Sequence, residues 1–213
     1  MKFGLMFFAA SVDAMEGAGY RLVVQSARFG DAHGFASVWV PERHFTPFGG
    51  LYPNPAVLQA ALAQATERIH LRAGSVVAPL HQPLRIAEEW AMVDNLSGGR
   101  VGISFASGWN PDDFALAPER YEERHAAVDE VIERVRHLWR GGEGEVRNGC
   151  GQMRRLKIFP APVQAELPVW VTAAGNPQTF AKAGRLGGHL LTHILDQDEE
   201  QLAAKIALYR QAR

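Results

Sequence analysis

The sequence predicts an α/β fold, a TIM (β/α)₈ barrel of which about six β/α units are present in 213 residues. Three observations predict it: short apolar runs recur along the chain, a helical pattern follows each of them, and long insertions follow individual strands. At 47% hydrophobic and 21% charged residues, the composition is that of a globular protein. Because an α/β barrel usually needs about 250 residues, we expect this one to be truncated at its C-terminal end.

The expected strands are continuous apolar runs between turn signals, the pattern of strands buried on both faces of a parallel sheet. They are residues 3–8, 36–40, 71–77, 101–105, 169–172 and 189–192. Between strands, apolar residues recur at helical spacing, first at Ile86, Trp90, Val93 and Leu96. A second helix, expected to start near Tyr121, carries Val128, Val131, Ile132, Val135 and Leu138. This alternation predicts βαβ units with right-handed crossovers.

An open doubly wound sheet is the alternative to a barrel. Its dinucleotide-binding form needs G-x-G-x-x-G after the first strand, but residues 9–13 read Ala-Ala-Ser-Val-Asp, and no G-x-x-x-x-G-K-[ST] loop occurs. Insertions at residues 41–55 and 141–163 favour the barrel. We expect the second insertion to form a small hairpin and a return loop, and residues 1–213 to make one domain.

Composition excludes several classes of protein. The 22 Lys and Arg residues against 23 Asp and Glu give a net charge of −1, which excludes a basic nucleic-acid surface and a polybasic membrane tether. The apolar runs are too short for a membrane span or a signal peptide. The single cysteine, Cys150, excludes an internal disulfide and a multi-cysteine metal site. We therefore expect a cytoplasmic protein.

The eight histidines do not suggest a metal site. None forms H-E-x-x-H, and only His189 and His193 are four residues apart. On and just after a strand, that step spans roughly 13 Å, too far to share one ion. We expect no bound metal.

Residues that could carry chemistry follow the strands, where a barrel builds its active site. Glu42, Arg43 and His44 follow the second strand; the plainer alternative is an exposed loop that begins with a salt bridge. After the fourth strand, residues 106–111 read Ala-Ser-Gly-Trp-Asn-Pro, a glycine turn that carries a hydroxyl and the indole of Trp109. This turn is either part of a ligand site or an ordinary loop with a packed indole.

The fifth strand leads into a helix that Asn176 should cap, with Pro177 at its first position. The free amides there, with the side chains of Asn176 and Thr179, form an anion site suited to a phosphate. The alternative is a capped helix that binds nothing.

Taken in order, several segments resemble the bacterial luciferase-like, flavin-dependent monooxygenase family. They are residues 2–4, 42–49, 54–55, 74–79, 81–85 and 94–100. The stretch 107–114, Ser-Gly-Trp-Asn-Pro-Asp-Asp-Phe, is most similar to the branch found in natural-product assembly lines, often fused to peptide synthetase or polyketide synthase modules.

The resemblance implies a barrel that binds reduced FMN, with the flavin ring against the end of the third strand. Gly74–Ser75 matches a non-proline cis peptide that contacts the ring. The remaining implied flavin contacts are Ser107, Gly108 and Trp109 after the fourth strand, Gly175, Asn176 and Thr179 at the phosphate, and Thr192 and His193 after the sixth strand.

Two departures from luciferase concern its substrate. The positions of Arg43 and His44 look like a His–His pair in luciferase, where the first histidine is catalytic. The phosphate-binding arginine after luciferase's fourth strand is absent here, where residues 106–108 read Ala-Ser-Gly. Both departures argue against light emission and an aldehyde substrate, but not against flavin binding.

The resemblance therefore implies a tailoring oxygenase of secondary metabolism that works through a C4a-(hydro)peroxyflavin. His44 would exchange the peroxide proton, Arg43 would stabilise an oxyanion, and Glu42 would orient one of them. Trp39 and Trp109 are candidates to wall the pocket. The alternatives are a deazaflavin (coenzyme F420) oxidoreductase and a non-catalytic flavin-binding remnant.

The partners implied are a small-molecule or carrier-bound substrate, O₂ and a separate flavin reductase, since no nicotinamide fingerprint is present. We also expect fusion to, or association with, synthetase modules, and a homodimer. Neither nucleic acid nor a membrane is an expected partner.

Overall fold

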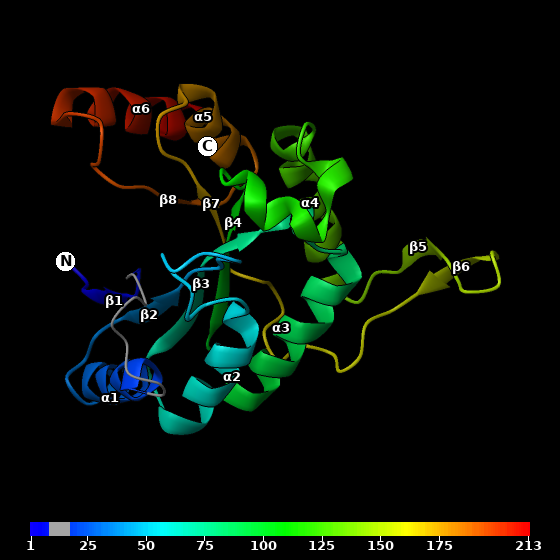
Figure 1. Cartoon of the computed structure of the whole chain (residues 1–213), viewed down its shortest axis with the longest axis horizontal. Helices are drawn as coiled ribbons and strands as arrows, with labels where there is room; N and C mark the ends of the chain where they lie inside the picture. The colour runs from blue at the N-terminus through cyan, green and yellow to red at the C-terminus, as the bar shows by residue number, and fades with distance from the viewer. Residues whose placement is uncertain (9–17) are drawn as a thin grey trace.

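The computed structural model describes residues 1–8 and 18–213, and its main feature is one curved parallel sheet (Figure 1). The sheet has six strands in the order β1-β2-β3-β4-β7-β8. The strands are β1 (Gly4–Met6), β2 (Ser37–Val40), β3 (His70–Val77), β4 (Val101–Ala106), β7 (Val169–Thr172) and β8 (His189–Leu191). This confirms the α/β barrel fold and its six expected strands. The turn at residues 9–13, whose sequence argues against a dinucleotide-binding sheet, lies outside the described residues.

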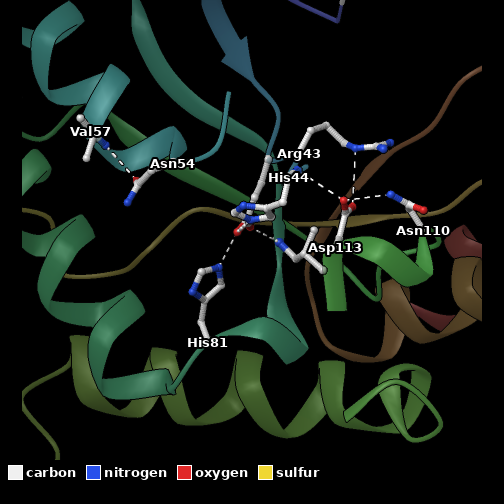
Figure 2. Close-up of polar contacts among 9 residues, drawn as sticks. Arg43, His44, Asn54, Val57, His81, Asn110 and Asp113 are labelled. Carbon is white, nitrogen blue, oxygen red and sulfur yellow. Dashed lines mark hydrogen bonds and ion pairs between the residues drawn. The ribbon is translucent and has the colours of Figure 1, made fainter. Parts of the chain in front are cut away.

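Helices follow the strands, as in βαβ units, and Figure 1 shows α1, α2 and α3 grouped on one side of the sheet and α5 beside α6 beyond β7. They are α1 (Ala18–Ala32), α2 (Pro55–Ala65), α3 (Pro83–Ser97), α4 (Arg124–Trp139), α5 (Pro177–Arg185) and α6 (Glu199–Ala212). Asn54 starts α2, because its Oδ1 accepts the Val57 amide at 3.1 Å (Figure 2), and Pro55 needs no partner for the amide it lacks.

Two helix ends differ in detail from what the sequence pattern alone indicates. The helix expected to start near Tyr121 begins at Arg124, because 3₁₀ turns η2 (Pro111–Leu116) and η3 (Pro118–Arg120) occupy the chain before it. Leu96 has the helical spacing of Trp90, which is buried, yet it is 45% exposed. The helix ends at the next residue, and Gly98 turns the chain away with φ +66°.

The core lies between the helices and the outer face of the sheet. Strand residues that alternate toward the helices are fully or nearly fully buried, namely Val38, Val40, Leu71, Ala73, Ile103, Phe105, Val169 and Val171. The parallel register aligns them, with Val38 opposite Leu71 and Ile103 opposite Val169. This packing holds the strands at a common level, so their carboxyl ends form one rim.

The opposite, concave face of the sheet carries a cationic and aromatic layer. The Arg72 guanidinium lies 4.4 Å from the ring centroid of Trp170 and 5.0 Å from that of Trp39. Trp170 in turn lies 4.8 Å from the ring of His189. A cavity of about 640 Å³ opens beside this layer at the amino ends of β1, β2 and β3. Trp39 therefore packs within the sheet's concave layer.

A hairpin of two antiparallel strands, β5 (Gly144–Arg147) and β6 (Met153–Leu156), extends away from the sheet in Figure 1. It falls within the insertion at residues 141–163. Its turn carries Cys150, which is exposed. The hairpin is therefore remote from the rim of the sheet and presents the chain's single thiol to solvent.

Candidate active site

A buried carboxylate lies at the rim of the sheet, just after β2. Glu42 is 3% exposed, and its Oε1 accepts hydrogen bonds from Nε2 of His44 at 2.9 Å and from Nε2 of His81 at 2.6 Å (Figure 2). Its Oε2 accepts the backbone amide of Val77 at 2.6 Å. An ionised carboxylate only accepts hydrogen bonds, so each imidazole presents an Nε2–H to it. The neutral form of His44 then keeps its lone pair on Nδ1.

Electrostatics favour charge separation within this cluster. Burial raises the pKa of Glu42, but the hydrogen bonds from His44, His81 and Val77 outweigh it, so that the pKa lies below its ordinary value. Burial opposes a charge on His81 too, yet the adjacent Glu42 carboxylate raises the pKa of His81 above its ordinary value. The arrangement therefore stabilises an anionic Glu42 and a cationic His81.

Arg43 is buried beside this cluster, with 4% of its surface exposed. Its Nε lies 3.5 Å from Oδ2 of Asp113, and its guanidinium lies 4.4 Å from the ring centroid of Trp109. A side chain at Gly49 would meet the Cγ of Arg43 at 2.6 Å, so the glycine lets the loop fold over the arginine. The exposed surface salt bridge considered as an alternative is therefore wrong: the ion pair is buried, and its acid is distant in sequence.

Asp113 connects Arg43 with the cluster formed by Glu42, His44 and His81. Its Oδ1 accepts the backbone amide of His44 at 3.3 Å and the side-chain amide of Asn110 at 3.0 Å (Figure 2). Within residues 1–8 and 18–213, however, Nε and Nη1 of Arg43 have no hydrogen-bond partner. A buried guanidinium with unsatisfied donors is suited to a ligand oxyanion.

Three hydroxyl groups line the rim at the ends of β3, β4 and β7. The Ser75 hydroxyl is hydrogen-bonded to the Thr172 hydroxyl, which lies 2.7 Å from Oγ of Ser104. The Gly74–Ser75 peptide bond is cis, as the family resemblance implies. A Cβ added at Gly74 would lie 3.1 Å from the Trp39 ring, a tight contact, so glycine leaves room for the indole at this point. These groups place hydrogen-bonding atoms at the end of the third strand.

The start of α5, where an anion site is expected, is a capped helix end. Asn176 is its N-cap, and its Oδ1 accepts the Gln178 amide at 2.9 Å. A Cβ added at Gly175 would meet no atom within 4 Å, so the space beside it is open. The remaining donors are the Asn176 side-chain amide, the Thr179 hydroxyl and free helix amides. Such donors fit a phosphate group.

The structure brings together some of the predicted residues and leaves others apart. Glu42, Arg43, His44 and Trp109 form one contact network through Asp113. In the described residues no hydrogen bond links this network to the α5 start or to the residues after β8. Among the latter, Thr192 has a buried hydroxyl without a partner in the described residues, and His193 is exposed. Ser107 and Gly108 are half-buried, and Gly108 has φ +78° against the Phe114 ring.

Sequence reasoning missed four residues that the structure places in the site. They are His81, Asp113, Ser104 and Thr172. His81 lay in a segment that resembles the family and follows the third strand, which could have marked it as a partner for Glu42. Asp113 follows the fourth strand through a 3₁₀ turn, and no periodicity in the sequence indicates that turn's direction.

The acidic and histidine side chains of the described residues are not grouped as metal ligands. No group of three or more His, Cys, Asp or Glu side chains among those residues could hold a metal ion. Over the same ranges, no helix combines the length and apolarity that a membrane crossing needs.

Comparison with known proteins places this arrangement in a family. The solved structure of the monooxygenase RslO1 from Streptomyces bottropensis is 30% identical, with a TM-score of 0.88 over 100% of this chain and 65% of that one. The oxygenase component of a flavin-dependent trigonelline monooxygenase from Acinetobacter baylyi is 29% identical over 86% of this chain and 52% of its own.

A relative with another cofactor also matches. The F420-dependent glucose-6-phosphate dehydrogenase of Amycolatopsis mediterranei is 33% identical over 79% of this chain and 52% of its own. The chain thus spans about half the length of these two relatives. The family described as luciferase-like monooxygenase matches residues 1–213, and the chain belongs to that family.

Proposed function

We propose that this chain forms the flavin- and O₂-binding part of a monooxygenase that uses reduced FMN delivered by a separate reductase. The observation that carries the proposal is the buried Glu42 carboxylate, which holds two imidazoles at the rim. Beside it lies Arg43, whose guanidinium has donors without a hydrogen-bond partner in the described residues. When bound, reduced FMN would supply the electrons that activate O₂ for insertion of one oxygen atom into an organic substrate.

The residues at the rim have distinct proposed roles. The α5 start, with Gly175, Asn176 and Thr179, would hold the FMN phosphate. Ser75 would contact the flavin ring, together with Ser107, Gly108 and Trp109 after β4 and with Thr192 and His193 after β8. Of these groups, Ser75 is buried and Ser107 and Gly108 are half-buried, which reduces the access of water to these contacts.

His44 and Arg43 are the proposed catalytic groups. Because Nε2 of His44 is held by Glu42, its Nδ1 would take up and release the proton that the reaction requires. Arg43 is permanently charged, and its Nη1, which has no hydrogen-bond partner in the described residues, would stabilise negative charge on oxygen. Glu42 fixes the orientation of the imidazole and would not itself react.

The proposal also names the source of the electrons and the class of substrate. A separate reductase is supported by the relative named as an oxygenase component. A small or carrier-bound substrate of secondary metabolism is supported by the resemblance of residues 107–114 to the assembly-line branch. We place the protein in the cytoplasm and treat residues 1–213 as one domain.

A second candidate is hydride transfer with coenzyme F420. The 33% identity to an F420-dependent dehydrogenase favours it over a non-catalytic flavin-binding remnant. Hydride transfer and oxygenation differ in the cofactor bound and in the need for O₂.

The test is cofactor binding followed by exposure to O₂. The protein is titrated anaerobically with FMN and with F420, and the absorption spectrum of the bound cofactor is recorded. We expect FMN to bind and the reduced complex to consume O₂ when a flavin reductase is added. Preference for F420 with no O₂ consumption would transfer the assignment to the second candidate. Binding of neither cofactor would overturn both.

A further inference from the structure

One oxygen atom of Glu42 serves two histidines. His44 reaches Oε1 from the loop after β2, and His81 reaches the same atom from the end of the 3₁₀ turn η1 (Ala78–Leu80) after β3. The distance to His81 is the shorter, 2.6 Å against 2.9 Å. The carboxylate cannot rotate to separate them, because its Oε2 is held by the Val77 amide at 2.6 Å. The two imidazoles therefore share a single acceptor.

We propose that His81 is a positioning residue for His44: by gaining or losing its own proton, it changes how strongly Oε1 of Glu42 holds the Nε2 proton of His44. When His81 is cationic, it neutralises much of the charge on Oε1, and the bond to His44 weakens. When His81 becomes neutral, Oε1 holds the Nε2–H of His44 more firmly. His44 is then fixed with its lone pair on Nδ1.

The charged side chains around the cluster are paired with one another, so the proposed coupling involves only Glu42, His44 and His81. On the His81 side, α3 presents Arg85 and Glu89, which form an ion pair with each other at 2.6 Å. On the His44 side, Asp113 pairs with Arg43. Each flanking charge has its own partner of opposite sign, so the charge of Glu42 is divided between the two imidazoles.

The two imidazole rings differ in solvent exposure, so the coupling runs from the more exposed His81 to His44. The His81 side chain is 27% exposed, whereas that of His44 is 10% exposed and that of Glu42 is 1% exposed. Protons from solvent thus have readier access to His81. The pH outside can set the state of His81, which passes the change to His44 through one oxygen atom. Only the catalytic consequence of this coupling rests on the proposed function.

The test uses the cofactor-free protein with ¹⁵N-labelled histidine. Nitrogen and proton NMR shifts of the His44 and His81 rings are followed from pH 5 to pH 9, a span of roughly two units around the ordinary histidine pKa. We expect the His44 Nε2–H signal to move in a step that coincides with the titration of His81. The variant His81→Gln keeps a neutral donor toward Oε1, so it should retain the Nε2–H tautomer of His44 and lose the step.

The matched control is His33→Gln, which changes an exposed histidine stacked on Phe29 and should leave the step unchanged. An unchanged step in His81→Gln, or a wild-type His44 with its proton on Nδ1, would overturn the proposal. His81→Ala is a second variant; with the donor gone, the His44 tautomer should become mixed, and circular dichroism would verify its fold.

A separate measurement distinguishes this proposal from the flavin assignment. In the FMN-loaded protein, H₂O₂ released per reduced FMN should vary with pH in wild type and be constant in His81→Gln. A step in the NMR titration without FMN binding would retain the coupling and remove the flavin function. FMN binding without the NMR step would retain the flavin function and overturn the coupling.

Discussion

The guanidinium of Arg43 lies 4.4 Å above the ring of Trp109, although Trp109 itself is 67% exposed. The exposed indole thus covers a buried charge. Stacking of a desolvated guanidinium on an indole contributes roughly 2 kcal/mol. The loop after β4 and the loop after β2 are held together by this contact and by the ion pair with Asp113.

Asp113→Asn should strongly destabilise the protein. The substitution leaves the Arg43 charge buried without its acid, and breaking a buried ion pair costs about 3–5 kcal/mol. Urea unfolding measures the loss. Asp112→Asn, a change of the exposed neighbour, is the control and should alter the free energy of unfolding by less than about 0.5 kcal/mol. Equal stability of the two variants would contradict the buried pair.

Replacing Asn176 and Thr179 together with alanine should weaken FMN binding at least tenfold. Each hydrogen bond to the charged phosphate is worth about 1.5–3 kcal/mol. Fluorescence titration of FMN measures the affinity. Because Asn176 also caps a helix, Asn54→Ala is the control: it removes a similar cap from α2 and should affect stability but not affinity. Unchanged affinity in the double variant would refute the phosphate site.

His44→Ala should leave FMN binding intact and release more H₂O₂ per reduced FMN consumed, at the expense of product. Groups that transfer protons typically contribute about 10²–10⁴-fold to the rate. Peroxide and product are quantified together once a substrate is known. Were coupling equal to wild type, the catalytic role would pass to Arg43.

The stability difference between wild type and His81→Ala should depend on pH. The pKa of His81 is raised in the folded state, so its contribution is complete below the ordinary value of 6.5 and lost as pH rises through the raised pKa. The pKa of Glu42 is lowered, so its contribution is complete above 4.5 and lost as pH falls through the lowered pKa. Thermal melts should therefore differ most between pH 4.5 and 6.5. A difference that grows from pH 7 to pH 9 would contradict the assignment.

The 213-residue chain alone should self-associate. Within the sheet described, β1 and β8 each pair on one side only, and Phe3 and Leu195 beside these edges are 65% and 70% exposed. Open strand edges with apolar neighbours recruit other chains. Sedimentation velocity should show dimers or larger species, and Phe3→Lys should reduce them. A monodisperse wild-type monomer would show that the edges are harmless.

The strands were predictable because strands buried on both faces are continuous apolar runs. Their ends were less predictable: of residues 3–8, only Gly4–Met6 form the strand, although the Phe7 amide and the Phe3 carbonyl also hydrogen-bond to the chain at β2. Leu96 has the right spacing for burial, but its position in the last turn of α3 exposes it. Helical spacing identifies a face of a helix and cannot show where neighbouring elements stop covering it.

Part of the site was predictable for a similar reason. Glu42, Arg43 and His44 follow directly after a strand, and the ends of parallel strands meet at one rim. Their partners could not be found this way, because His81 is 39 residues from Glu42 and Asp113 is 69 residues from His44. These contacts depend on 3₁₀ turns after β3 and β4. Such short turns have no repeating residue spacing from which their direction could be predicted.

The lone thiol at the tip of the β5–β6 hairpin makes the protein convenient to label. An iodoacetamide or maleimide dye would attach only at Cys150, so every labelled molecule would carry its probe at the same place. Alkylation leaves the carboxylate, imidazole and guanidinium groups of the rim untouched. Any loss of turnover after alkylation would therefore report a role of the hairpin, such as contact with a carrier or a reductase, and not damage to the reaction centre.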